Sequence, residues 1–139
     1  MLVSANPKAE LADHADVHLA VDTGPEAVAG STRLKAGTAQ KLVLNSLSTA
    51  LMVALGRTYS NLMVEMNAAN AKLRGRVLTI LTEASGEPED ACALALAEAD
   101  GEVKTAIVML IGGVGAAEAR AAVIGGGGRV RVALAGMGR

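Results

Sequence analysis

The chain has 139 residues, which is enough for one ordinary domain or two small ones. A net charge of −1 with dispersed basic residues, together with an aromatic content of 1%, argues against nucleic-acid binding by charge or base stacking. Hydrophobic residues make up 51% of the chain, but there is no Phe or Trp. A core made from Ala, Val, Leu, Ile and Met favours closely packed helices.

Cys92 is the single cysteine, so no internal disulfide can form, and the chain suits a reducing, cytoplasmic setting. We interpret Cys92 as a small buried residue of a helix and not as a reactive thiol. The start of the chain lacks the pattern of a signal peptide. The longest apolar stretches, Ala50–Leu55 and Ala106–Ile111, are too short to cross a membrane, so we expect a soluble protein without a membrane partner.

Residues 1–23 predict a strand, a short helix and a second strand. Met1–Ser4 is apolar and ends at Asn6-Pro7, Glu10–Asp16 is polar, and Val17–Val21 is rich in β-branched residues. This order is typical of a parallel α/β crossover. Two parallel strands cannot cover both faces of a sheet, so we expect further strands from another chain or from the rest of a larger domain.

Two histidines, His14 and His18, stand four residues apart, a spacing that on a helix would suit a metal ion. His18 falls in the predicted strand, and no nearby acid completes a ligand set at helical spacing. We therefore interpret the histidines as a surface pair, and we predict no metal site.

The segment 24–41, GPEAVAGSTRLKAGTAQK, combines an acid, hydroxyls and cations at a predicted helix start. Ser31 and Thr32 can cap the helix, Arg33 and Lys35 supply positive charge, and Glu26 follows the end of a strand. Hydroxyls, free backbone N–H groups and cations together suit an oxyanion or a sugar phosphate. The alternative, a capped helix start with solvated basic residues, fits the spacing equally well.

The remainder reads as helices. The first, from Thr38 to about Leu55, carries apolar residues at helical spacing and ends at Gly56. Tyr59 lies in a connector, as a packing residue with its hydroxyl bonded or, alternatively, as a substrate contact. The later helices are expected at 68–84, 89–99, 102–111 and 116–123, with a last element at 129–134.

Two glycine-rich stretches interrupt these helices. Gly112–Gly115 lacks the spacing and the strand context of a dinucleotide loop, so we predict no such cofactor there. Gly125–Gly128 lowers helix stability by about 1 kcal/mol per glycine relative to alanine. We therefore expect the element at 129–134 to pack poorly and the tail to fray.

GPEAVAGSTRLKAGTAQKLVLN closely resembles the signature shared by the N-acetylmuramic acid 6-phosphate etherases and the glucokinase regulatory protein, of the sugar isomerase domain family. The similarity extends upstream through VSANPK and LADHAD, and downstream through LST, LGRTYSNLMV and KTAIVM. It therefore covers nearly the whole chain. The glycine run 125–128 departs from the pattern of the family.

The resemblance implies a mostly α chain in two parts. Residues 1–66 would be the C-terminal, α/β part of a sugar isomerase domain, with the signature and a long helix. Residues 67–139 would be a small helical bundle similar to ubiquitin-associated domains.

The resemblance also implies a carbon–oxygen lyase of peptidoglycan recycling, which needs no cofactor and converts N-acetylmuramic acid 6-phosphate into N-acetylglucosamine 6-phosphate and D-lactate. The family's catalytic glutamates precede the segment that this chain matches, so we assign no catalytic residue. We expect five residues to shape the sugar-phosphate pocket: Glu26, Ser31, Thr32, Arg33 and Lys35.

Three functions remain open from the sequence. In the first, the chain is a C-terminal portion of the etherase that is inactive alone and functions only if the N-terminal half is supplied, and its partner would be that half or a second copy in a homodimer. Alternatively, it would be a non-catalytic sugar-phosphate-binding regulatory module. A third possibility is a helical oligomerisation module.

Overall fold

The computed structural model describes residues 1–66 and 71–138, leaving aside the side chains of residues 71 and 72. The chain forms two compact units, Met1–Leu51 and Met52–Arg139. The described part holds six α-helices and only short strands, which confirms a mostly α chain. Residues 52–66 cluster with the later helices, whereas the predicted division at residues 66 and 67 concerns family domains and stays a prediction.

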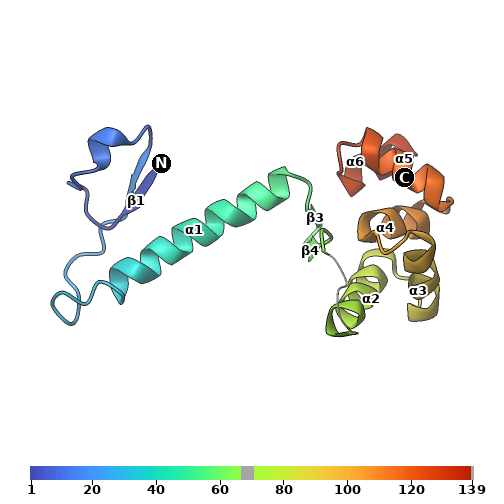
Figure 1. Cartoon of the computed structure of the whole chain (residues 1–139), viewed down its shortest axis with the longest axis horizontal. Coiled ribbons are helices and arrows are strands. Elements are labelled where there is room, and N and C mark those ends of the chain that lie inside the picture. Colours follow the sequence, from blue (N-terminus) through green and yellow to red (C-terminus); the bar gives the residue numbers. More distant parts are fainter. Residues whose placement is uncertain (67–70, 139) are drawn as a thin grey trace. The chain divides into compact units, whose positions relative to one another are not determined.

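The first unit opens with the predicted strand, short helix and strand (Figure 1). Strand β1 (Leu2–Ser4) pairs in parallel with β2 (His18–Ala20), and Leu2 stands opposite His18. A single 3₁₀ turn, η1 (Ala12–His14), lies between them. The crossover expected from the sequence is confirmed. Its helical part is a 3₁₀ turn of three residues, which is shorter than the helix expected at 10–16.

Helix α1 (Lys35–Ala54) begins three residues before the predicted start at Thr38. Its N-terminal amides are capped from a distance by Glu26, which sequence spacing could not show. Ala36 is its one buried residue in the described structure. Its larger apolar side chains, such as Leu42, Leu47 and Leu51, are exposed.

Helix α1 ends in a Schellman motif, which confirms the predicted cap at Gly56. The amide of Gly56 donates to the carbonyl of Val53, the amide of Arg57 donates to that of Met52, and Gly56 has a φ of +68°. The motif leaves the carbonyl of Ala54 without a partner inside the helix. Nη2 of Arg129 donates to that carbonyl at 2.8 Å.

A β-hairpin occupies the stretch predicted as a connector. Strand β3 (Thr58–Tyr59) pairs antiparallel with β4 (Leu62–Met63), so Ser60 and Asn61 form a two-residue turn. Ser60 has a φ of +54°, a conformation usual for glycine in such turns. The sequence carries no glycine there, which explains why the hairpin was missed.

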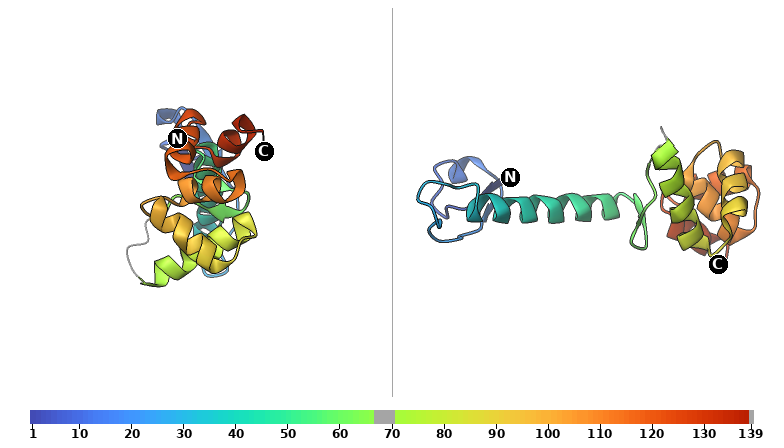
Figure 2. Two further views of the ribbon diagram at one scale, coloured as in Figure 1. Left: turned by 90° about the vertical axis from the view of Figure 1, so that its right-hand side faces the viewer. Right: turned by 90° about the horizontal axis from the view of Figure 1, so that it is seen from below.

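Five helices follow the hairpin and gather in one group (Figure 2). They are α2 (Ala71–Ser85), α3 (Glu89–Glu98), α4 (Val103–Gly112), α5 (Ala116–Gly125) and α6 (Val130–Gly136). These helices confirm the predicted ones within a few residues. One of the predicted helices spans 68–84, and its residues 68–70 lie outside the described part of the chain.

Helix α4 is the centre of this group, since it contacts α2, α3, α5 and α6. Seven of its ten residues are buried, including Ile107 and Val108 with no exposed surface. The predicted apolar side of α2 is also confirmed, because Val77, Ile80 and Leu81 are buried in the same core. Cys92 is fully buried there too, as expected.

The expected fraying of the tail is wrong. Val130, Ala133 and Leu134 of α6 are buried. The glycines before them close α5 by a second Schellman motif, in which the amides of Gly127 and Gly128 donate to the carbonyls of Ile124 and Val123. Both glycines have positive φ, of +62° and +75°. The run therefore forms a tight turn that brings α6 back onto the core.

Among the described residues, no single helix has both the length and the apolar character needed to cross a membrane. Helices α4 and α5 are long and apolar enough only when they are taken together, and the two helices are bent by 110° at the break between them.

Candidate functional site

A polar pocket of about 430 Å³ lies in the first unit, at the carboxyl ends of β1 and β2. This edge is where ligands bind in open parallel α/β sheets. The first turns of α1 close the pocket through Ala36 and Gln40. Its other lining residues come from the loops that leave the strands and from the signature segment: Ser4, Ala5, Asn6, Thr23, Gly24, Glu26 and Thr32.

Glu26 holds the signature segment against α1. Its Oε2 accepts the amide of Lys35 at 2.9 Å, and its Oε1 accepts the amide of Ala36 at 3.0 Å. These two hydrogen bonds, first that from Ala36, lower the pKa of Glu26 below its ordinary value, and the positive charge of Lys35 adds to the effect. Glu26 is therefore a carboxylate at neutral pH, placed at the positive end of the helix dipole.

The helix start differs from the expected one in its capping groups. Ser31 and Thr32 were expected to cap α1 with their hydroxyls, but the side chain that bonds the first amides is that of Glu26. Thr32 contributes its backbone carbonyl, which accepts the amide of Gly37 at 2.8 Å. Two of the amides proposed for an oxyanion are thus already bonded to a carboxylate of the chain.

The structure brings two of the five predicted site residues, Glu26 and Thr32, to the pocket. Ser31, Arg33 and Lys35 lie in the same segment but outside its lining. Nζ of Lys35 donates to the carbonyl of Pro25 at 2.8 Å, so this cation fastens the loop.

Four polar side chains of the pocket were not singled out from the sequence: Ser4, Asn6, Thr23 and Gln40. The hydroxyl of Ser4 donates to the carbonyl of Asn6 at 2.8 Å and lies 2.7 Å from Nε2 of His18. Nε2 of Gln40 lies 3.5 Å from the carbonyl of Val3. The available signal was the position of these residues after each predicted strand, where a parallel sheet gathers its loops.

Two stretches were considered in the sequence as possible binding sites, the histidine pair for a metal ion and the glycines at 112–115 for a dinucleotide. The described part of the chain holds no group of three or more His, Cys, Asp or Glu side chains that could bind a metal ion. In the stretch 112–115, Gly113 has a φ of +67° and terminates α4, so this glycine serves the helix end.

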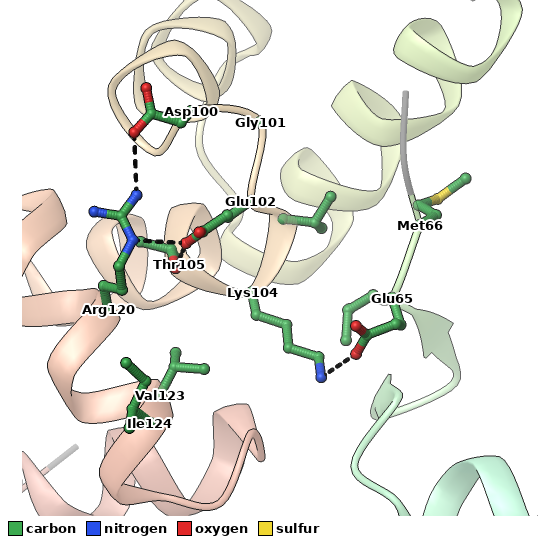
Figure 3. Close-up of a pocket in the computed structure, with 12 residues that line it drawn as sticks. Glu65, Met66, Asp100, Gly101, Glu102, Lys104, Thr105, Arg120, Val123 and Ile124 are labelled. Atoms are coloured by element: carbon green, nitrogen blue, oxygen red, sulfur yellow. Dashed lines mark hydrogen bonds and ion pairs between the residues drawn. The ribbon is translucent and has the colours of Figure 1, made fainter. Parts of the chain in front are cut away.

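A second pocket, of about 540 Å³, lies in the second unit between Glu65, the start of α4 and α5 (Figure 3). Its charged groups are bonded to one another. Lys104 pairs with Glu65, and Nε of Arg120 donates to Glu102 at 2.9 Å. The hydroxyl of the buried Thr105 also donates to Glu102, at 2.7 Å. This pocket therefore presents few free polar groups to a ligand.

The pocket of the first unit has the features of a small-molecule site on a parallel α/β crossover, lined by hydroxyls and amides beside one carboxylate. Its signature segment is also the part of the sequence that carries the family resemblance. The geometry thus defines a class, a binding site for a small polar molecule, and comparison with known proteins gives the family.

No family model matches the chain. Curated relatives do match it, and they carry one name, N-acetylmuramic acid 6-phosphate etherase. The protein from Thermobifida fusca is 61% identical over 111 residues, which are 80% of this chain and 36% of the relative. The Deinococcus radiodurans protein is 53% identical over 129 residues, or 93% and 42% of the two chains. For Cutibacterium acnes the identity is 51% over 132 residues, or 95% and 43%.

The resemblance seen in the sequence is confirmed: the chain is a homologue of the C-terminal portion of the N-acetylmuramic acid 6-phosphate etherases. It spans less than half the length of the curated relatives that it matches.

Proposed function

We propose that this chain supplies the C-terminal portion of an N-acetylmuramic acid 6-phosphate etherase and that its first unit forms part of the sugar-phosphate pocket. The observation that supports this most is the polar pocket at the carboxyl ends of β1 and β2, which the signature segment lines. In this proposal, residues 1–66 are the end of a sugar isomerase domain, and residues 67–139 are a bundle of the ubiquitin-associated type.

The signature residues have different roles in this proposal. Thr32 contacts the substrate through its hydroxyl in this proposal, because Thr32 is one of the residues that line the pocket. Glu26 positions the pocket by fixing the start of α1. Ser31, Arg33 and Lys35 flank the pocket, where the two cations make its surroundings more favourable for a phosphate.

Ether cleavage by elimination needs a base that removes a proton and an acid that assists the leaving lactate. Glu26 is the one carboxylate in the lining of the described pocket, and both of its oxygens accept helix amides. The pocket therefore lacks a free pair of carboxyl groups. We propose that the partner of this chain in the cytoplasm is a complementing N-terminal half of the etherase or a second copy in a homodimer.

The test is a lactate assay with N-acetylmuramic acid 6-phosphate. We expect no D-lactate from the purified 139-residue chain and D-lactate after co-expression with the N-terminal half of a curated relative. Lactate from the chain alone that disappears in Glu26→Gln would overturn the assignment of Glu26 as a positioning residue. No lactate from the combined halves, although they copurify, would contradict the etherase proposal.

Thr32→Val and Thr38→Val make a matched pair for substrate binding. Both remove a hydroxyl from the same region, but only Thr32 lines the pocket. In the combined halves, we expect Thr32→Val to raise KM about fivefold or more, the effect of one hydrogen bond of about 1 kcal/mol. Thr38→Val should leave KM unchanged, and equal effects of the two changes would contradict the assignment of Thr32.

The regulatory and oligomerisation alternatives are not favoured, because the curated relatives compared above all carry the name of the etherase.

A further inference from the structure

A third cavity, of about 300 Å³, lies in the second unit where the hairpin turn meets α2 and α6. Its lining includes the aromatic residue Tyr59 and four polar residues: Ser60, Asn61, Glu83 and Arg131. The volume is at the lower limit for small-molecule sites, so a ligand of this cavity would be about the size of a monosaccharide.

The polar groups of this cavity form no hydrogen bonds or ion pairs with one another in the described structure, in contrast to those in Figure 3. Within the described part of the chain, the side chains of Ser60, Asn61 and Glu83 have no hydrogen-bond partner. Glu83 and Arg131 line the same cavity but form no ion pair with each other. Their hydrogen-bonding capacity is therefore open to solvent and to a ligand.

The donors and acceptors in the lining indicate which kind of ligand the cavity could bind. Arg131 only donates hydrogen bonds, Glu83 only accepts them, and Ser60 and Asn61 do both. A phosphate would be attracted by Arg131 but repelled by Glu83, and an ammonium group would be attracted by Glu83 but repelled by Arg131, so neither charge gains much from the pair as a whole. A neutral hydroxyl both donates and accepts, so a neutral molecule with several hydroxyls matches the whole set.

Two further features belong to the same place. The guanidinium of Arg131 lies 5.8 Å from the ring centre of Tyr59, and this contact holds the cation at the cavity. Ser60 keeps a φ of +54°, a costly conformation for a residue other than glycine. Such backbone strain tends to occur at ligand-binding sites, and Ser60 is one of the residues that line the cavity.

We infer that this cavity is a binding site for a neutral polyhydroxylated ligand of monosaccharide size, separate from the pocket of the first unit. Glu83 accepts ligand hydroxyls, Arg131 and Asn61 donate to ligand oxygens, and Tyr59 supplies an apolar part of the wall. This site lies entirely in the second unit, so it does not depend on the proposed etherase function.

The experiment is a titration of the 139-residue chain, followed by ¹H–¹⁵N NMR, with a neutral hexose, the same hexose 6-phosphate and the corresponding hexosamine. The neutral hexose should shift the amide signals of residues 59–62 and 83–84 in a saturable way. The phosphate and the amine should bind there about fivefold or more weakly, because each must lose part of the hydration of its charge while attraction to one charged residue is offset by repulsion from the other.

Glu83→Ala and Glu98→Ala are the matched variants, since both remove an exposed carboxylate from a helix. Glu83→Ala should weaken hexose binding about tenfold, as expected for a lost hydrogen bond to a charged group. Glu98→Ala should bind like the unchanged chain, and thermal unfolding confirms that both variants fold. No saturable shift with the hexose, equal binding of hexose and phosphate, or equal effects of the two variants would overturn the proposal.

Discussion

The two compact units of this chain bury their apolar side chains to very different extents. In the described part of residues 1–51, the one buried apolar residue is Ala36, and several leucines of α1 are exposed. In the described part of residues 52–138, sixteen buried residues form one cluster around α4. The second unit therefore has a core of its own. The first has a pocket whose shape depends on hydrogen bonds such as those of Glu26.

The largest effect in this comparison should come from the core of the second unit. Ile107 has no exposed surface, so Ile107→Ala should lower the free energy of unfolding by about 2–5 kcal/mol. Leu42→Ala on α1 is the control, and because Leu42 is 59% exposed its effect should stay within about 0.5 kcal/mol. Urea unfolding measures both. Similar losses for the two variants would mean that the first unit has a core that the structure does not show.

The next effect concerns the end of α1. An alanine at Gly56 must adopt a φ of +68°, and its Cβ would lie 2.5 Å from Cγ of Arg129. Gly56→Ala should therefore cost about 1–3 kcal/mol. Gly101→Ala shares the positive φ, of +82°, but meets no atom within 4 Å, so it isolates the cost of the dihedral angle. Equal losses in thermal unfolding would show that the contact with Arg129 adds nothing.

A smaller effect of opposite sign is expected at the hairpin turn. Ser60→Gly removes the strain of a φ of +54° but adds chain entropy to the unfolded state. The net result should be a gain of about 0.5 kcal/mol, measured by thermal unfolding. Asn61→Gly is the control at the neighbouring position, which has no positive φ, and it should bring a loss. A loss in both variants would argue against strain at Ser60.

The smallest effect should appear in acid. The hydroxyl of Thr105 and then the guanidinium of Arg120 lower the pKa of Glu102 from its ordinary value of 4.5. Since the folded pKa lies below the unfolded one, the stabilisation is complete above about 4.5 and is lost as pH falls through the folded pKa. Glu102 is exposed, so the contribution should be about 0.5 kcal/mol or less.

Glu102→Gln should accordingly remove a small part of the pH dependence of the second unit's unfolding between neutral and acidic pH. Glu98→Gln is the control on α3, since Glu98 is exposed and forms no hydrogen bond or ion pair in the described structure, and it should leave the profile unchanged. A steeper acid dependence in Glu102→Gln than in the unchanged chain would contradict the sign of the shift.

Much of the fold could be predicted from the helical spacing of apolar residues and from the prolines and glycines that end helices. The helices α2–α5 follow apolar residues at helical spacing, bounded by Pro88, Asp100-Gly101 and the glycines at 112–115. The hairpin was missed because Ser60 takes a glycine-like conformation without being glycine. The low helix propensity of glycine predicts poor packing of α6, but Gly127 and Gly128 lie in a turn between two helices, where a positive φ is favourable.

The candidate site was predicted less completely than the fold. Local chemistry pointed to the segment 24–41, and Glu26 and Thr32 do line the pocket. Ser4 and Gln40 come from distant positions, and only the pairing of β1 with β2 and the direction of α1 bring them there. The cap of α1 by Glu26 joins residues nine and ten positions apart across an irregular loop. Spacing rules for helix caps cover neighbours within one turn, so they could not predict it.

The hydrogen bond from Arg129 to the carbonyl of Ala54 spans 75 positions of the chain. Contacts between such distant residues form only after a large loop has closed, and the entropy of that closure must be overcome first. The final turn of α1 should thus gain its full protection from hydrogen exchange late in folding, together with α6. A chain truncated before Arg129 would lose this hydrogen bond, so the junction between α1 and the hairpin should be the first part to lose stability.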